Sequence, residues 1–422
     1  MTALRIPWAR WFPALAERNV RLYMLGQSVS ILGTWVLDIL LNLVLWEGTR
    51  SPALLGTLNF LLYMPGLVIT PLFAAGLSAA NARRRTMGVL AGGLAVAAAL
   101  AACSAAGRLT VPAIMALAIA RGVLNGMEQP ARQMLLASSV PSPAHIGGAV
   151  ALNTLVFQVA RMAGPALAAL LFAGVGAAWG FAFSALAIVV MMACVLRVRP
   201  AAIADPTAGQ PAGDAAPRGG LRGALSFVRA DRFGSLFLPV IVCMAACTGG
   251  YQSLVPVLAD RVFGNTARWT SLFFAAAGAG ALSAALIFST TWATAAQRRL
   301  PVPVPWLVAL ALLGLGFSRS APASLLCFGV IGFGMTALTV GTTATLHRHV
   351  PPDARNGLIA LMLVAFNGVV ALAQMPAGLL AARFGVQGAF RVMGGAMLGA
   401  MLLLFAARWR RLGRIETDAE RL

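Results

Sequence analysis

The feature of this chain that most constrains its fold is a series of long apolar runs separated by short polar stretches. Most runs are about 20 to 25 residues long, the length that an α-helix needs to cross a hydrocarbon layer of ~30 Å. The twelve runs lie at 22–46, 52–79, 86–106, 111–136, 147–173, 178–196, 236–259, 269–293, 303–318, 322–346, 357–382 and 388–407. Only 10% of the residues are charged, far below the share in an average soluble domain. We therefore predict an all-α integral membrane protein with twelve transmembrane helices.

The positive charge is distributed unevenly along the chain. The formal net charge is +20, and every cationic side chain apart from histidine is an arginine. With the N-terminus in the cytoplasm, roughly 22 arginines fall on the cytoplasmic side of the predicted helices and about 6 on the other side, in agreement with the positive-inside rule. Both chain ends are therefore expected in the cytoplasm. The charge is expected to orient the protein in the lipid bilayer, and we expect no nucleic acid as a partner.

Polar stretches divide the chain into five segments. The N-terminal stretch contains arginines and the cluster Trp8, Trp11 and Phe12, which is typical of an amphipathic segment at a membrane surface. The stretch 197–235 is rich in Pro, Gly, Ala and charge and cannot bury a core, which predicts a linker. The predicted segments are a cytoplasmic amphipathic segment 1–21, a six-helix bundle 22–196, a cytoplasmic linker 197–235, a second six-helix bundle 236–407 and a basic cytoplasmic tail 408–422.

The two six-helix halves resemble each other. In the first half VPSPAHIGGAVALN leads to GPALAALLFAGVG, and in the second half VPPDARNGLIALML leads to MPAGLLAARFGVQ. Pro165 and Pro376 fall at matching places in these segments. Parallel repeats of six helices with both ends on one side are the arrangement of secondary transporters of the major facilitator type.

Several stretches of the first half resemble one group within that superfamily. They are GQSVSILGTW at Gly26–Trp35, SPALLG at Ser51–Gly56, and the long run from Gly126 that begins GMEQPARQMLLASSVPSPAHIGGAVALN. These stretches are similar to bacterial drug and siderophore exporters related to the enterobactin exporter. The resemblance covers most of the first half and is looser in the second.

The resemblance implies a monomeric multi-pass exporter in the inner (cytoplasmic) membrane of a bacterium. It implies alternating access, a small organic substrate such as a siderophore or an amphipathic drug, and no cofactor or metal, with the proton gradient as the energy source. Two alternatives on the same fold are a flippase for lysophospholipids or other lipids, and a facilitator that works without protons. A membrane enzyme is disfavoured because the sequence has only 3 histidines and no converging set of catalytic residues.

The loop after the second predicted span departs from the superfamily pattern. Related sequences have Gly, three residues, Asp, a basic residue and then a basic pair, whereas this loop reads GLSAANARRR from Gly76. Ala80 stands at the Asp position, where the family Asp helps to lock one state of the transport cycle. The cytoplasmic gate is therefore expected to depend on the three arginines Arg83, Arg84 and Arg85.

Charged residues within the predicted spans are few and costly, since one charge in the centre of a bilayer costs at least ~2.5 to 3.5 kcal/mol. Counting ~1.5 Å per residue from the ends of the spans places Asp38 about 24 Å and Arg161 about 21 Å from the cytoplasmic side. Glu128 lies about 10 Å from that side, and Arg121 about 15 Å from the opposite one. We therefore predict a buried cluster in which Arg161 is the first partner of Asp38 and Arg121 the second.

Two roles for this cluster remain open from the sequence. Asp38 exchanges a proton during transport, or the cluster is a static salt bridge that holds three helices together. Glu128 is either a proton entry point or a solvated residue at a helix end that pairs with Arg132 at the i+4 position.

Two further sets of residues are candidates for helix packing and for substrate binding. Gly164 and Pro165 resemble the Gly-Pro motif of antiporters in the superfamily, although Ala168 and Ala169 replace its later glycines. Glycine allows close helix packing and proline bends the helix. If the architecture of the family holds, polar and aromatic residues line a substrate cavity. These candidates are Trp35, Asn42, Asn59, Tyr63, Asn125, Gln158, Tyr251, Gln252, Asn367 and Gln374.

Overall fold

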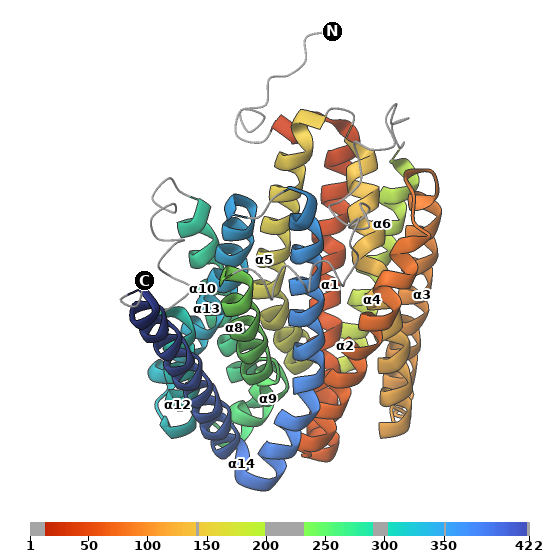
Figure 1. Ribbon diagram of the computed structural model, residues 1–422. Helices are drawn as coiled ribbons and strands as arrows, with labels where there is room; N and C mark the ends of the chain where they lie inside the picture. The colour runs from red at the N-terminus through yellow and green to blue at the C-terminus, as the bar shows by residue number, and fades with distance from the viewer. Residues whose placement is uncertain (1–12, 141–142, 199–231, 290–302, 350–351, 420–422) are drawn as a thin grey trace. The chain divides into compact units, whose positions relative to one another are not determined.

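The computed structural model describes residues 13–140, 143–198, 232–289, 303–349 and 352–419, and within these ranges every regular element is a helix (Figure 1). The helices are η2 (Pro13–Ala16), α1 (Arg18–Thr49), α2 (Pro52–Ala75), α3 (Ala79–Ala105), α4 (Val111–Ser139), α5 (Pro143–Gly174), α6 (Ala177–Arg197), α8 (Arg232–Thr248), α9 (Tyr251–Arg261), α10 (Thr266–Ser289), α12 (Pro303–Phe317), α13 (Ala321–His349) and α14 (Pro352–Ala419). Residues 1–12 of the predicted N-terminal segment and residues 199–231 of the predicted linker lie outside the described residues.

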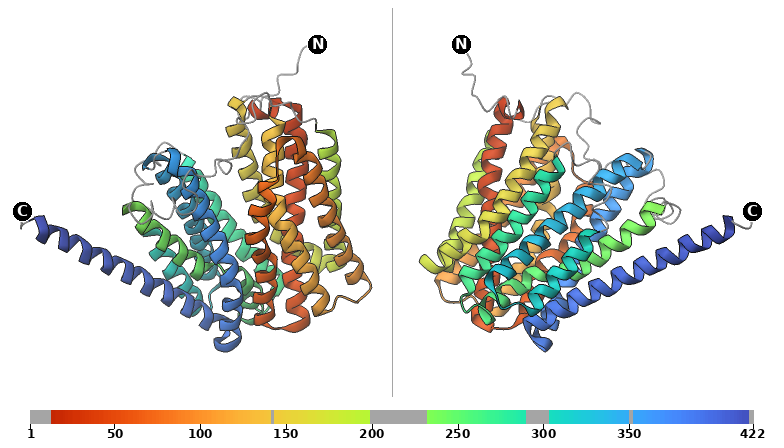
Figure 2. Two further views of the ribbon diagram at one scale, coloured as in Figure 1. Left: turned by 45° about the vertical axis from the view of Figure 1, so that its right-hand side comes forward. Right: turned by 90° about the vertical axis from the view of Figure 1, so that its left-hand side faces the viewer.

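Within the described residues, ten helical stretches are long and apolar enough to cross a membrane. One of them, Leu238–Arg261, comprises most of α8 together with α9, and another, Val364–Ala406, extends over both of the last two predicted spans. Gly385 interrupts α14 between these two spans with φ 73° and ψ 165°, and Figure 2 shows that the helix turns back there. Pro303–Phe317 is apolar but shorter than the others. The all-helical membrane fold is therefore confirmed, and the number of crossings stays a prediction.

The chain divides into two compact units. The first comprises Met1–Ala216 and Val255–Gly278, and the second comprises Pro217–Leu254 and Ala279–Leu422. The predicted boundaries of the two six-helix bundles stay a prediction.

In the first unit, α1 packs mainly against two other helices. It lies against α5 and α6, while α2 packs against α4, and α3 against α4 and α6 (Figure 1). Glycines bring these helices close together: a Cβ atom on Gly33 of α1 would lie 2.6 Å from Cβ of Ala187, and one on Gly122 of α4 would lie 2.3 Å from the Leu61 carbonyl oxygen. Helices in membranes associate through such small residues because lipid provides no hydrophobic driving force between them.

In the second unit, α14 packs against α8 and α12, and α12 packs against α13. The segment Gly249–Gly250 separates α8 from α9 where a single span was predicted, and it lies tightly against α14. A Cβ atom on Gly250 would lie 2.1 Å from Cβ of Ala377. The fully buried rings of Tyr251, Phe328 and Phe390 form the aromatic part of this core.

Candidate functional site

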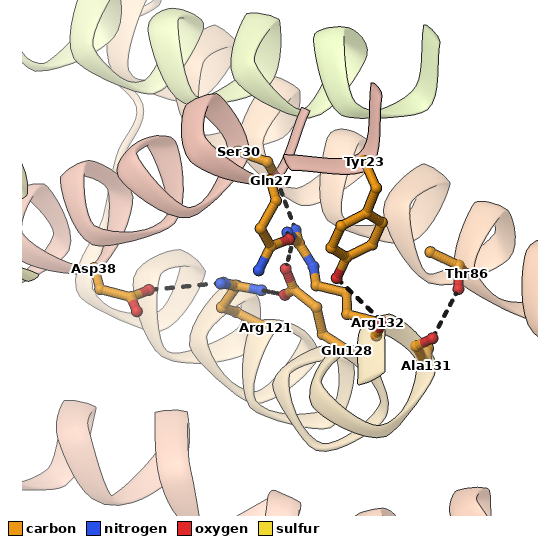
Figure 3. A network of polar contacts seen from close by, with 9 residues as sticks. All are labelled: Tyr23, Gln27, Ser30, Asp38, Thr86, Arg121, Glu128, Ala131 and Arg132. Atoms are coloured by element: carbon orange, nitrogen blue, oxygen red, sulfur yellow. Dashed lines mark hydrogen bonds and ion pairs between the residues drawn. The ribbon is translucent and has the colours of Figure 1, made fainter. Parts of the chain in front are cut away.

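Four charged side chains of α1 and α4 meet inside the first unit (Figure 3). Glu128 lies between two arginines: its Oε2 is 3.0 Å from Nη1 of Arg121, and its Oε1 forms an ion pair with Nη2 of Arg132. The Nε atom of Arg121 lies 3.6 Å from Oδ1 of Asp38. The arginine side chains are only 5% and 4% exposed. Two carboxylates thus balance two guanidinium groups, which is what burial of charge requires.

The spacing of these residues along α4 places them on one side of the helix. Arg132 follows Glu128 by four residues, and Arg121 precedes it by seven, which is close to two helical turns. The three side chains therefore form one stripe, which faces α1 (Figure 3). The i+4 pair of Glu128 with Arg132, which one of the two alternatives predicted, is confirmed. The side chain is only 17% exposed and both oxygens are paired, so the residue is not solvated as that alternative expected.

Helix α1 supplies a matching polar stripe. Arg132 donates hydrogen bonds to Oε1 of Gln27 and, at 2.7 Å, to Oγ of Ser30. The hydroxyl of Tyr23 donates to the carbonyl oxygen of Arg132 at 3.0 Å. These three α1 residues were not predicted from the sequence. Their spacing of four and three residues was the available signal, because it puts Tyr23, Gln27 and Ser30 on one face of a helix.

The negative charges of the two carboxylates are not compensated equally by the arginines of the cluster. Both oxygens of Glu128 lie close to a guanidinium nitrogen. Among the described residues, Oδ1 of Asp38 accepts no hydrogen bond, and Nε of Arg121 donates none. The 3.6 Å approach of these two atoms is an ion pair without hydrogen-bond geometry. Asp38 is therefore the carboxylate with the weaker support for its negative charge.

Asp38 pairs with the second of its two predicted partners rather than with the first. Its ion pair is with Arg121, whereas the guanidinium of Arg161 lies 6.0 Å from the centre of the Trp35 ring. Equal depth along the membrane normal does not fix the direction in which each side chain leaves its helix. Asp38 points from α1 to α4 (Figure 3), while Trp35, one turn earlier, contacts α5.

The contact between Trp35 and α5 explains the predicted Gly-Pro motif. A Cβ atom on Gly164 would lie 2.4 Å from Cβ of Trp35, so this position accepts no larger residue without displacement of a helix. Phe157 meets the Trp35 ring edge-on at 6.0 Å. The carbonyl oxygen of Pro165 accepts a hydrogen bond of 3.2 Å from Oγ of Ser271.

The side-chain amide of Asn81 forms hydrogen bonds across the loop after α2. Nδ2 of Asn81 donates to the Gly76 carbonyl oxygen at 2.9 Å, and its Oδ1 accepts from the Ser78 amide at 2.8 Å. The guanidinium of Arg85 lies 5.3 Å from the centre of the Phe73 ring and beside Gly76. Arg83 donates to the carbonyl oxygen of Leu196 at the end of α6, and Arg84 is exposed.

Several amides proposed for the substrate cavity serve helix packing. Nδ2 of Asn59 in α2 donates to Oδ1 of Asn42 in α1 at 2.6 Å, and both residues are buried. Nδ2 of Asn125 points to the Leu62 carbonyl oxygen at 3.5 Å. Nδ2 of Asn42 donates to the Asp38 carbonyl oxygen at 2.8 Å, and Nδ2 of Asn59 also donates to the Leu55 carbonyl oxygen at 2.9 Å. These amide groups are therefore engaged in contacts within and between helices.

The other cavity candidates differ widely in exposure. In the second unit Tyr251 and Gln374 are fully buried, and neither amide atom of Gln374 has a hydrogen-bond partner among the described residues. Asn367 is exposed. The candidates that are partly exposed are Trp35, Tyr63 and Gln158 in the first unit and Gln252 in the second. Of the predicted set, Trp35 has its ring 6.0 Å from the guanidinium of Arg161, and Gln158 precedes Arg161 by three residues on α5.

Comparison with known proteins agrees with this fold. A family model described as transmembrane secretion effector matches residues 10–421. The staphyloferrin A transporter of Staphylococcus aureus (strain NCTC 8325 / PS 47) is 22% identical over 370 residues, which cover 86% of this chain and 89% of that protein.

Two solved structures with similar folds are distant from this chain in sequence. The nucleoside transporter NupG has a TM-score of 0.66 at 12% identity, over 92% of this chain and 98% of its own. A POT family transporter has a TM-score of 0.70 at 11% identity, over 93% and 96% of the two chains. The chain belongs to the transmembrane secretion effector family, and is a multi-pass membrane transporter of the major facilitator superfamily that resembles bacterial siderophore and drug exporters.

Proposed function

We propose that this protein is a secondary active exporter that moves a small organic molecule out of the cytoplasm by alternating access and draws its energy from the proton gradient. In this proposal the chain crosses the membrane twelve times, both ends lie in the cytoplasm, and the protein works as a monomer. The family description and the related siderophore transporter support a siderophore or an amphipathic drug as the substrate. The positive-inside distribution of arginine supports the orientation.

The observation that supports proton coupling is that the negative charge of Glu128 has closer positive partners than the negative charge of Asp38. Both oxygens of Glu128 lie beside an arginine, and these two positive charges stabilise its negative charge. Within the described residues, the one ion pair of Asp38 is the 3.6 Å contact with Arg121. A proton on Asp38 removes that attraction and leaves Arg121 with Glu128. Asp38 is thus the group whose protonation costs the cluster least.

Protonation of Asp38 also has a structural consequence in this arrangement. Arg132, with its bonds to Gln27 and Ser30, continues to tie the first half of α1 to α4. The Asp38 contact is then lost farther along α1, close to Trp35, whose ring meets Phe157 and Arg161 of α5. A proton at Asp38 therefore changes how α1 is held beside the partly exposed Trp35, Gln158 and Arg161, where we place substrate contacts.

Transport into inverted membrane vesicles, which corresponds to efflux from the cell, tests the coupling. Siderophores and cationic dyes are offered with and without an uncoupler, for the wild type, Asp38→Asn and Asp38→Glu. Glu47→Gln is the matched control, because it removes one carboxylate from the same helix at an exposed position. We expect Asp38→Asn alone to lose the dependence of efflux on the proton gradient while it is expressed normally.

Gradient-driven efflux that persists in Asp38→Asn would assign the cluster a purely structural role. If the uncoupler does not change efflux by the wild type, the result favours a facilitator. Movement of lysophospholipids between the leaflets of the same vesicles favours a flippase. These outcomes separate the three functions that the fold permits.

A further inference from the structure

One charged residue inside the predicted spans is not part of the Asp38 cluster. Arg391 lies in the second unit and is the only charged residue between Arg383 and Arg408. It follows the start of the predicted span 388–407 by three residues, which places it about 5 Å into that span. A guanidinium at this depth needs water, protein or a lipid headgroup around it.

The side chain of Arg391 is fixed at the C-terminal end of α12. Its Nε donates to the Gly316 carbonyl oxygen at 3.0 Å, and its Cζ lies 5.1 Å from the centre of the Phe317 ring. The last carbonyl groups of a helix have no partner within the helix and attract positive charge. Within the described residues this is the one hydrogen bond of Arg391, so its two terminal nitrogens are left to bind something else.

Glycines allow this close approach of α12 and the second part of α14. A Cβ atom on Gly316 would lie 2.5 Å from Cγ of Arg391 and 3.0 Å from its backbone nitrogen. A Cβ atom on Gly394 would lie 2.8 Å from the Leu313 nitrogen. The direction of the Arg391 side chain is therefore set by the packing of two helices.

The surface around the guanidinium is apolar and exposed. Phe317, whose ring lies beside Arg391, is 70% exposed, and Leu310, seven residues earlier on the same side of α12, is 57% exposed. Exposed apolar side chains of membrane-spanning helices meet lipid tails. Arg391 is itself exposed, so its free nitrogens and the Phe317 ring are both accessible to lipid.

The turn after α12 adds a second cation. Arg319 is exposed, and the residue before it, Ser318, accepts a hydrogen bond of 2.9 Å at its carbonyl oxygen from Nε2 of Gln387. This bond joins the turn to α14 one helical turn before Arg391. Arg319 and Arg391 are thus carried by two segments that are fastened to each other.

No carboxylate of the neighbouring sequence compensates these two charges. Between Asp260 and Glu416 the sequence has a single acidic residue, Asp353. It lies near the start of α14, about 48 Å of helix before the turn at Gly385. Glu416 lies at the opposite end of the same helix, about 46 Å beyond Gly385. The counter-charge for the two arginines must therefore come from outside this part of the chain.

From these observations we infer that Arg391, Arg319 and Phe317 form a binding site for the headgroup of an anionic phospholipid, called here the α12 lipid site. The planar fork of a guanidinium matches two oxygens of a phosphate, and the exposed ring packs against the adjoining part of the lipid tail. Basic sites between membrane helices bind lipid headgroups in this way. Two cations without a carboxylate repel the ammonium of a zwitterionic ethanolamine lipid, which favours a lipid with net negative charge. The site is separate from transport and does not depend on the proposed function.

Native mass spectrometry of the purified, delipidated protein tests the site. Phosphatidylglycerol is the probe, and phosphatidylethanolamine is the zwitterionic comparison. Competition with inorganic phosphate distinguishes a lipid from a free phosphate as the occupant. The variants are Arg391→Gln, Arg391→Lys and Arg319→Gln. Arg108→Gln is the matched control, because Arg108 is an exposed arginine in the turn between α3 and α4 of the first unit.

We expect Arg391→Gln to raise the apparent Kd for phosphatidylglycerol at least ~tenfold, in line with the loss of charged hydrogen bonds. Arg391→Lys keeps the charge but not the fork and is expected to raise it about threefold. Arg319→Gln, which removes an exposed charge, is expected to raise it about two- to threefold. In the wild type phosphatidylglycerol binds at least ~fivefold more tightly than phosphatidylethanolamine, inorganic phosphate does not displace it, and Arg108→Gln leaves its binding unchanged.

Wild-type affinity for phosphatidylglycerol in both Arg391→Gln and Arg319→Gln would overturn the site. Displacement of the lipid by inorganic phosphate, or equal binding of the two lipids by the wild type, would overturn the anionic lipid as its occupant. If Arg391→Gln does not fold, Arg319→Gln decides, because its side chain lies in an exposed turn. Lipid binding is measured without transport, so a protein that binds phosphatidylglycerol as expected but moves no siderophore or dye refutes the proposed function and leaves the α12 lipid site in place.

Discussion

Arg132 is the residue whose loss should reveal most clearly what holds α1 to α4. Arg132→Met keeps an unbranched apolar stem and removes the ion pair with Glu128 together with the hydrogen bonds to Gln27 and Ser30. The removal of one partner of a buried pair costs about 3 to 5 kcal/mol. Glu128 keeps its 3.0 Å contact with Arg121, which lowers that cost. Each hydrogen bond between membrane helices adds about 0.6 kcal/mol. We therefore expect a loss of about 3 kcal/mol.

Thermal unfolding in detergent measures this loss through a thiol-reactive dye. The five cysteines are free, so unfolding exposes them to the dye. Arg84→Met is the matched control, because Arg84 is an exposed arginine on α3 and the substitution is the same. A double-mutant cycle with Glu128→Gln isolates the pair, and we expect the two changes together to cost less than the sum of the single changes. Equal midpoints for Arg132→Met and Arg84→Met would refute the reasoning.

Three further substitutions follow from the packing around this site. Gly164→Val places a Cβ atom 2.4 Å from that of Trp35, so we expect little folded protein on size-exclusion chromatography, while Gly174→Val, with open space at its Cβ position, behaves as wild type. Asn81→Ala removes the cap of α3 and its bond to Gly76, and is expected to cost about 1 kcal/mol in thermal unfolding; an unchanged midpoint contradicts this. Asn59→Leu leaves Oδ1 of Asn42 without its 2.6 Å donor and is expected to cost about 1 to 3 kcal/mol. Full recovery of stability in Asn42→Leu/Asn59→Leu supports a packing role, whereas loss of substrate binding at normal stability contradicts it.

The sequence indicated most of the helices of the fold because membrane crossing is a local requirement. A helix of about 20 apolar residues is needed wherever the chain enters lipid, so composition alone indicated where such helices lie. The break of α14 at Gly385 falls between two predicted spans. The separation of α8 from α9 at Gly249–Gly250 was not predicted, because the run 236–259 is apolar throughout.

The charged cluster was only partly predictable. The scarcity of charge in the spans identified Asp38, Arg121, Glu128 and Arg161 as residues that need partners. Which of them pair depends on the rotation of each helix about its axis, and a calculation of depth contains no information on rotation. Arg121 reaches both Asp38 and Glu128 because it lies on the side of α4 that faces α1.

The sequence by itself determined that this chain is helical, lies in a membrane and contains a few charges that cannot remain alone in lipid. Only the tertiary structure decided that Arg132 is bound by Gln27 and Ser30, that Arg161 lies on Trp35, and that Asp38 meets Arg121. The physical reason is that hydrophobicity is a property of each segment, whereas a pair of charges is stabilised within a few ångströms and therefore depends on how distant segments pack.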